Sequence, residues 1–349
     1  MLFEKIKKRI NAKKVIKDDW VYFFFRGRVK KYFPDADKLL AVKTEIIRNF
    51  RGKFRNLSLR YTLTYLKKDN RKKQGVLRAK INTLHLNPKR HYLTLCFLKE
   101  QGFGKYISDP VDYIADLNLF LYKELKGECF QDFLSTHKNL NLLLSATPKI
   151  SDFIYRVHSL PVKPSPKFRV AEKDFEKSCR YHWSFLVRKC APAFFPKMRA
   201  LLDEVWKQRS KKNITYKKPL SLIHGDFHWG NIILVTKNRV GFLDFGDSKL
   251  SDPFVDLASF IVQTESMFRY YCPNKDKLKQ AIIKKFLQNY FKRDLTKQEQ
   301  AKLLYFEANQ YLQIAAVHAF IEPNPVYKKQ GLETLLGAAE KKIDLLKSL

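Results

Sequence analysis

The feature that most constrains the fold is a predicted strand-turn-strand segment. At each of its two outer ends stands a residue whose side chain can bind a metal ion. The expected strands are Ile232 to Val235 and Arg239 to Leu243, separated by residues 236–238. In a hairpin centred on that turn, Asn231 and Asp244 would be cross-strand neighbours, with Cβ atoms about 5 Å apart. An amide oxygen and a carboxylate at that separation can hold one Mg²⁺ ion through bonds of about 2.1 Å.

The residues around this hairpin match the spacing of a phosphoryl-transfer site. Asp226 precedes Asn231 by five positions, as the catalytic Asp precedes the metal-binding Asn in the kinase loop H-R-D-x-x-x-x-N, and residues 244–246 repeat its D-F-G. Phosphoryl transfer needs a carboxylate that orients and deprotonates an acceptor hydroxyl, and metal ions that neutralise developing charge. The spacing therefore predicts Asp226 as the catalytic residue and Asn231 and Asp244 as ligands of Mg²⁺.

The same segment carries a resemblance to a known family. Residues 224–232 (HGDFHWGNI) closely resemble the H-G-D-x-H-x-x-N signature of the aminoglycoside phosphotransferase and choline kinase family. The resemblance spans roughly residues 44–320 and is strong between 220 and 258. Four further segments look like other family motifs: 244–246 (DFG), 252–258 (DPFVDLA), the helix end 155–160 (YRVHSL) and the hinge 119–130 (LFLYKELKGECF).

The resemblance implies an α+β, bilobal protein-kinase-like fold, with a small β-rich N-lobe and a larger, mainly helical C-lobe. It also implies ATP, magnesium and a hydroxyl acceptor on a small molecule or a sugar. A protein acceptor is not expected, because Gly225 replaces the Arg of H-R-D and no A-P-E follows Asp244. Asp256 follows Asp244 by only 12 positions, which is short for an activation loop.

Hydrophobic periodicity and turn residues suggest how the chain is divided. We expect a basic N-terminal extension (1–43), an N-lobe (44–121), a hinge (122–128) and a C-lobe (129–349) with the catalytic segment 220–258. The elements expected are strands at 57–66, 76–81 and 117–122, a helix from Pro88 to Glu100, and C-terminal helices around 278–290, 296–320 and 331–349.

Residues of the N-lobe and hinge are expected to contact ATP. Lys80 lies where the family's strand places its phosphate-contacting lysine, although a lysine on a basic strand can be merely a solvated charge. Its usual partner, a helix Glu, is not evident: His91 stands near that position, and Glu100 lies too far along the helix. The other candidates for ATP binding are Gly52, in the best phosphate-loop segment, and the hinge residues Lys123 and Leu125.

Three residues are expected to support the catalytic loop. His224 and His228 are interpreted as hydrogen-bonding or packing residues, and Asp256 as an acceptor for backbone N–H groups of the loop. The two histidines have the i, i+4 spacing of a zinc pair, but Gly225 and the nearby Gly230 argue against the helix that such a pair needs.

Charge gives a further indication of the partner. The chain has 68 Lys and Arg against 34 Asp and Glu, a net charge of +34, and residues 1–80 alone hold 25 basic against 7 acidic residues. Such a field attracts anions and repels polycations such as aminoglycosides. It favours an anionic acceptor, with a cell-envelope glycan or a glycolipid precursor as the leading candidate.

Composition limits the classes of protein that this chain can belong to. No apolar run approaches the ~20 residues that span a bilayer, and no secretory signal is visible. Its five cysteines form no C-x-x-C pair, as expected for reduced thiols in a cytoplasmic protein. The basic start of the chain could form an amphipathic helix that reaches the inner face of an anionic membrane, or a solvated helix docked on the N-lobe.

Two functions from other classes remain open at this stage. One is nucleic-acid binding on an inherited kinase scaffold, since aromatic and basic residues interleave at 25–28 and 50–55, although no recognised module accompanies them. The other is a catalytically dead scaffold, suggested by the missing Glu partner of Lys80. Retention of Asp226, Asn231 and Asp244 argues against that alternative.

Overall fold

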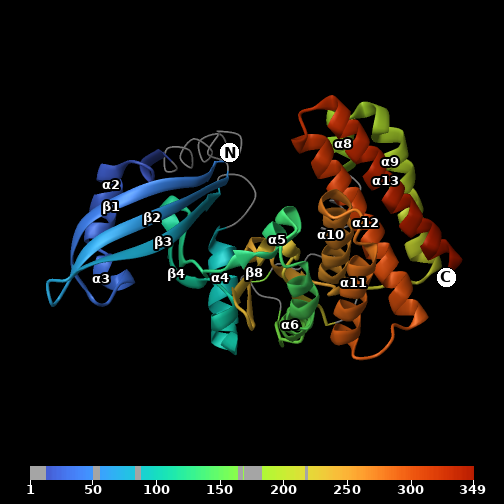
Figure 1. Ribbon diagram of the computed structural model, residues 1–349. Helices are drawn as coiled ribbons and strands as arrows, with labels where there is room; N and C mark the ends of the chain where they lie inside the picture. Colours follow the sequence, from blue (N-terminus) through green and yellow to red (C-terminus); the bar gives the residue numbers. More distant parts are fainter. Residues whose placement is uncertain (1–12, 50–55, 83–87, 164–167, 169–182, 217–218) are drawn as a thin grey trace. The chain divides into compact units, whose positions relative to one another are not determined.

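The chain forms two compact units (Figure 1). The first comprises residues 1–127 and 235–247, and the second residues 128–234 and 248–349. The chain first passes from one unit to the other after Gly127, and the hinge at 122–128 stays a prediction. This computed structural model describes residues 13–49, 56–82, 88–163, 168, 183–216 and 219–349.

The first unit is built on a five-stranded antiparallel sheet with the strand order β1-β2-β3-β5-β4. The apolar residues predicted to alternate along β2 (Asn56–Lys67) are buried on one face of the sheet. The strand expected at 76–81 is present, and the one expected at 117–122 begins two residues later, because Ala115–Leu117 form a 3-10 turn. The other strands are β1 (Ala36–Asn49), β3 (Lys72–Asn82), β4 (Asp109–Ile114) and β5 (Leu119–Lys123).

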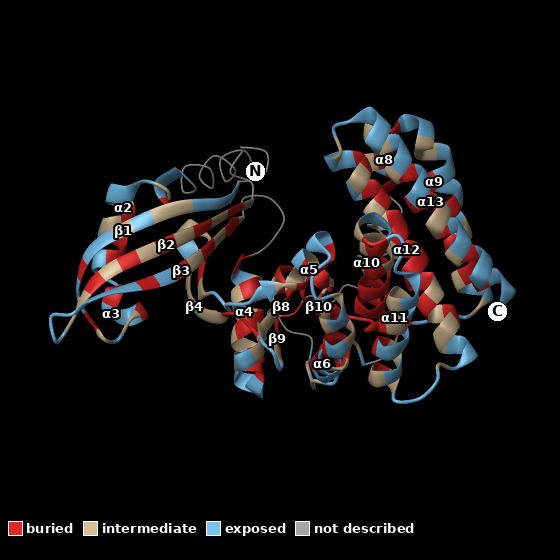
Figure 2. Cartoon of the chain, in the orientation of Figure 1, coloured by how far each residue is buried: buried red, intermediate tan, exposed pale blue. Residues whose placement is uncertain are grey.

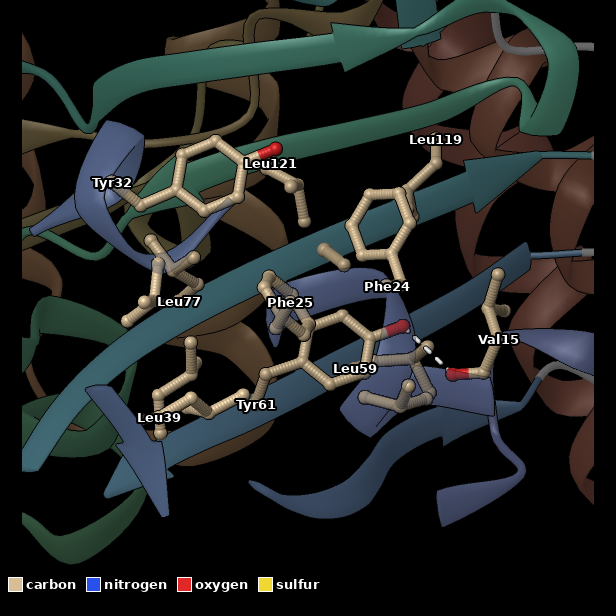
Figure 3. Packing of buried hydrophobic residues seen from close by; sticks show 14 of the residues in the cluster. Val15, Phe24, Phe25, Tyr32, Leu39, Leu59, Tyr61, Leu77, Leu119 and Leu121 are labelled. Carbon is tan, nitrogen blue, oxygen red and sulfur yellow. Dashed lines mark hydrogen bonds between the residues drawn. The ribbon is translucent and has the colours of Figure 1, made fainter. Parts of the chain in front are cut away.

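Residues 13–43 belong to this unit, so the N-lobe does not begin at residue 44 as expected. Helices α2 (Asp18–Arg26) and α3 (Val29–Tyr32) bury apolar side chains in the same cluster as β2 and β3 (Figure 3). Tyr61 on β2 donates a 2.8 Å hydrogen bond to the carbonyl of Val15. These contacts make the segment part of the hydrophobic core. The expected amphipathic helix falls mainly on residues 1–12, outside the described residues.

Strand β1 was missed because its residues do not alternate regularly. Among the described strands it pairs only with β2, and the register shifts at three places, each adding one residue to β1. Two of the added residues, Leu40 and Ile47, are apolar and exposed at 38% and 48%. Bulges of this kind twist an edge strand and discourage pairing with other chains.

Helix α4 (Pro88–Leu98) lies between β3 and β4 in the chain and ends two residues before the predicted Glu100. A π-helical turn, Lys99–Phe103, continues it and contains Gly102 at a φ of 83°, in the left-handed region that glycine adopts readily. Strand β9 (Arg239–Phe242) joins this unit from much later in the chain, through a parallel bridge between Ile107 and Phe242.

The second unit is mainly helical. Its core helix, α10 (Phe254–Tyr271), is buried along the whole stretch from Phe254 to Val262, as Figure 2 shows. The surrounding helices are α5 (Phe130–Thr136), α6 (Leu140–His158), α8 (Ser184–Cys190), α9 (Phe195–Lys211), α11 (Asp276–Phe291), α12 (Lys297–Ile321) and α13 (Pro325–Ser348). Short strands are β6 (Glu128–Cys129), β7 (Ser221–Ile223), β8 (Ile232–Thr236, whose last two residues belong to the first unit) and β10 (Lys249–Ser251).

The predicted start of α12 is confirmed in detail. Thr296 accepts a hydrogen bond from the N–H of Glu299, and the Glu299 carboxylate accepts one from the N–H of Thr296. This reciprocal capping box satisfies two N–H groups that an isolated helix end would expose. Within the described residues, no helix has the length and apolarity needed to cross a membrane.

Candidate active site

The predicted catalytic loop lies in the second unit, between β7 and β8. Strand β7 pairs with β10 in antiparallel fashion, with Leu222 opposite Leu250, and is buried throughout. The chain then turns at Gly225, whose φ of 85° lies in the left-handed region. A residue with a Cβ would be strained there, which gives a physical reason for glycine at the position that is Arg in H-R-D.

Asp226 and Asn231 are brought together within this loop. The Asn231 side-chain amide donates to the backbone carbonyl of Asp226 at 2.9 Å and to its carboxylate Oδ2 at 3.0 Å. The Asp226 side chain remains 46% exposed. The loop therefore holds the carboxylate in one orientation and still presents it to solvent, as a base acting on an incoming hydroxyl requires.

His228 and His224 hydrogen-bond to the backbone of the same loop. Nδ1 of His228 accepts from the N–H of Gly230 at 3.0 Å, and its Nε2 lies 3.4 Å from Asp226 Oδ1 and 3.2 Å from the Asn231 amide nitrogen. Nδ1 of the fully buried His224 lies 3.3 Å from the donating N–H of Asp226. Both side chains thus fix the backbone and orientation around Asp226.

Asp256 anchors the loop from α10 and is fully buried. Its carboxylate accepts the N–H groups of His224 at 2.6 Å and Gly225 at 2.8 Å, which are the backbone contacts expected of it. Burial alone would raise the pKa of Asp256, but the hydrogen bond and charge of His158 and the contacts with His224 and Gly225 lower it overall. The carboxylate is therefore held in its ionised form.

His158 is a supporting residue that the sequence did not reveal as such. It lies at the end of α6, is buried, and places Nε2 3.0 Å from Asp256 Oδ2 and Nδ1 2.8 Å from the Tyr290 hydroxyl. The only signal was the similarity of residues 155–160 to a family helix end. A pattern on one helix cannot show that its histidine meets a carboxylate 98 positions away.

The first unit holds Lys80 and Asp244 together. The Lys80 ammonium on β3 lies 2.7 Å from Asp244 Oδ1, so an aspartate, not the family's helix glutamate, pairs with this lysine. Asp244 has a φ of 57°, a left-handed conformation that aspartate tolerates better than most residues. His91 on α4 places Nδ1 3.9 Å from the same oxygen. Burial, aided by the Asp244 charge, raises the pKa of Tyr122 beside them.

The remaining nucleotide candidates are less well defined. Lys123 is the last residue of β5 and lies with its ammonium 5.7 Å from the centre of the Phe33 ring. Leu125 is partly buried in the loop that follows. Gly52 lies outside the described residues, so its role and those of Lys123 and Leu125 stay predictions.

Asn231 and Asp244 each offer an oxygen atom of the kind that binds magnesium. Because the Asn231 amide nitrogen donates both bonds to Asp226, its Oδ1 is directed elsewhere, and it accepts no hydrogen bond from the described residues. Asp244 supplies a carboxylate. Such oxygens suit Mg²⁺, which binds one or two protein groups and completes its shell with water and phosphate. Asn231 and Asp244 belong to different units, and their cross-strand pairing stays a prediction.

Solved structures with this fold are known. The choline kinase LicA from Streptococcus pneumoniae is 13% identical, with a TM-score of 0.59 over 92% of this chain and 99% of that one. A Plasmodium vivax ethanolamine kinase is 14% identical, with a TM-score of 0.58 over 85% and 82%. A streptomycin-ATP-APH(2")-IIa complex is 14% identical, with a TM-score of 0.54 over 89% and 94%. They confirm the predicted protein-kinase-like fold.

The family is established by a second comparison. The model of the phosphotransferase enzyme family, APH, matches residues 98–292, more than half of the chain. No curated protein sequence matches. The matched range includes the catalytic loop, Asp244 and Asp256. The chain therefore belongs to the phosphotransferase enzyme family and is a small-molecule kinase with a hydroxyl acceptor.

Proposed function

We propose that this kinase transfers the γ-phosphoryl group of ATP, with Mg²⁺, to a hydroxyl of an anionic, sugar-like acceptor. The observation that carries the proposal is the pair formed by Asp226 and Asn231. The amide of Asn231 fixes an exposed carboxylate, and the same side chain keeps an oxygen for a metal ion. The ATP named in the APH(2") complex supports the choice of nucleotide.

Each residue has a defined role in this reaction. Asp226 accepts the proton of the acceptor hydroxyl while the new oxygen–phosphorus bond forms and the bond to the β-phosphate oxygen breaks, releasing ADP. Asn231 orients Asp226 and, with Asp244, would hold Mg²⁺, which neutralises phosphate charge when bound. Lys80 would contact the phosphates, and Asp256 keeps the loop in place.

The acceptor class is inferred from charge. A net charge of +34 creates a positive field that concentrates anions and repels cations near the protein. This favours acceptors such as an acidic sugar or a phosphorylated glycolipid precursor of the cell envelope. Choline and ethanolamine, from which the two neighbouring kinases take their names, are cations and are not favoured by this field.

An acceptor screen at two ionic strengths tests this proposal. Neutral sugars, acidic sugars, choline, ethanolamine and an aminoglycoside are each assayed by ADP release, and kcat/KM is measured at low and physiological salt. We expect the highest kcat/KM for an anionic acceptor, and a fall in kcat/KM as salt screens the attraction. A preferred cationic acceptor, or a kcat/KM that rises with salt, would contradict the proposed class.

Substitution of Lys80 should weaken nucleotide binding. In Lys80→Met the charged hydrogen bond to phosphate is lost, which is worth about 1.5–3 kcal/mol, so the Kd for ATP with Mg²⁺ should rise about 10- to 150-fold. The Kd is measured by calorimetry. Lys72→Met, an exposed lysine on the same strand, is the control and should leave the Kd unchanged. Equal Kd values for both variants would exclude Lys80 from the nucleotide site.

A further inference from the structure

The second unit contains a cavity that shares no residue with the catalytic loop. Its volume is about 740 Å³, within the range of about 300–1,000 Å³ typical of small-molecule sites. It lies where the loop between α5 and α6 meets the loop between α10 and α11. The lining residues are His137, Asn139, Leu140, Asn141, Leu142, Cys272, Pro273, Asn274 and Lys275.

The lining combines positive charge, amides and apolar surface. Lys275 and His137 are the only residues in its lining that can carry a positive charge, and no carboxylate lines it. Three asparagines supply amide groups that both donate and accept hydrogen bonds, as ligand hydroxyls do. Leu140, Leu142 and Pro273 add apolar surface of the kind that the C–H face of a sugar ring can contact.

Lys275 is placed to act at this cavity. Burial raises the pKa of the Cys272 thiol, and the Lys275 ammonium partly offsets that rise, so its charge is felt at the cavity wall. No ion pair of Lys275 is found among the described residues. The neighbouring carboxylate, that of Asp276, forms its ion pair with Lys279 and not with Lys275. A cation at the N-cap of α11 opposes the helix dipole, an arrangement that a bound anion would relieve.

Two helix ends reinforce the same preference. Helices α6 and α11 both begin at the cavity, and they contact each other further along, where Ser151 donates a 2.8 Å hydrogen bond to the carbonyl of Phe286. Neither N-cap residue, Asn139 or Lys275, caps its helix with its side chain. Backbone N–H groups of both first turns add positive potential beside the amides and the ammonium, although the carboxylate of Asp276 in the first turn of α11 offsets part of it.

We propose that this cavity is a second ligand site, which binds a phosphorylated sugar or polyol. The phosphate would lie against Lys275 and the helix ends, and the hydroxyl groups against Asn139, Asn141 and Asn274. The inference rests on the cavity and its lining and not on the proposed reaction, so it holds or fails independently of the acceptor.

Calorimetric titration of the full chain tests the proposal, with glucose 6-phosphate, glucose and inorganic phosphate as probes. We expect glucose 6-phosphate to bind more tightly than either fragment. Lys275→Glu should weaken it at least about tenfold, and Asn141→Leu about two- to tenfold. Lys277→Glu is the matched control, because it makes the same charge change on α11 outside the cavity. It should leave the affinity unchanged, as should Asp226→Asn in the catalytic loop.

Three results would overturn the proposal. The first is that glucose 6-phosphate does not bind. The second is an equal loss of affinity for it in Lys275→Glu and Lys277→Glu. The third is a loss of affinity in Asp226→Asn, which would place the ligand at the catalytic loop. Circular dichroism of each variant establishes that it is folded. The failure of this site would not affect the proposed kinase reaction, because neither Lys275 nor Asn141 takes part in it.

Discussion

Asp226→Asn should lower the kcat for phosphoryl transfer by about 10²- to 10⁴-fold, the usual contribution of a positioned general base. The amide cannot accept the proton of the acceptor hydroxyl. Its remaining carbonyl oxygen can still receive the hydrogen bond from Asn231, so the loop should keep its shape. Nucleotide affinity should change little, because the substituted group acts on the acceptor.

The rate is measured by ADP release with the best acceptor from the screen, and nucleotide binding by thermal stabilisation. A nucleotide at 100 times its Kd adds about 2.7 kcal/mol to the free energy of unfolding, and this increment should persist in the variant. Asp203→Asn, an exposed aspartate on α9, is the control and should retain full activity. A rate in Asp226→Asn within tenfold of the wild type would rule out Asp226 as the base.

Asp256→Ala should lower the free energy of unfolding of the second unit by about 3–5 kcal/mol, the typical cost of removing one partner of a buried ion pair. It leaves the N–H groups of His224 and Gly225 and the Nε2 of His158 buried without their acceptor. The loop that holds Asp226 loses the same anchor. Activity should therefore fall even at temperatures where the variant is folded.

Urea denaturation measures this loss, and His158→Ala completes a double-mutant cycle. Because the two side chains form one hydrogen-bonded pair, the double variant should be more stable than the sum of the single losses predicts. Ser159→Ala, next to His158 but exposed, is the control for perturbing the end of α6. Strict additivity of Asp256→Ala and His158→Ala would show that the pair is not coupled.

The pH dependence of stability follows from the same carboxylate. Its pKa is lowered in the folded protein, so its contribution is fully present above the unfolded pKa of about 3.9 and is lost as pH falls through the folded value. The wild type should therefore lose stability in acid more steeply than Asp256→Ala. Parallel acid profiles for the two proteins would contradict an ionised Asp256.

The parts of the site that sequence reasoning found are local. Asp226 and Asn231 are five positions apart. This spacing and the glycines of their loop identify its chemistry before any tertiary contact is known. The partner of Lys80 could not be found in this way, because Asp244 reaches β3 from a segment 164 positions later in the chain. His158 and Asp256 are paired over a similarly long separation.

The N-terminal boundary was misplaced for two physical reasons. The many basic residues before position 44 suggested a solvated extension. The apolar residues Val21, Phe24 and Phe25, which lie among those basic residues in the sequence, are nevertheless buried in the core. The bulges of β1 also interrupt its two-residue period, so Leu40 and Ile47 fall out of phase with the buried residues. Regular strands such as β2, without this interruption, were predicted almost to their ends.

The discontinuous first unit has a consequence for protein synthesis. A ribosome adding about 5–20 residues per second needs about 6–24 s after Gly127 to reach Asp247, the last residue of that unit. Until then, the nascent unit lacks the bridge between Ile107 and Phe242, and Lys80 lacks Asp244. A fragment cut at the hinge would resemble this incomplete intermediate, whereas expression of the whole chain supplies the missing strand.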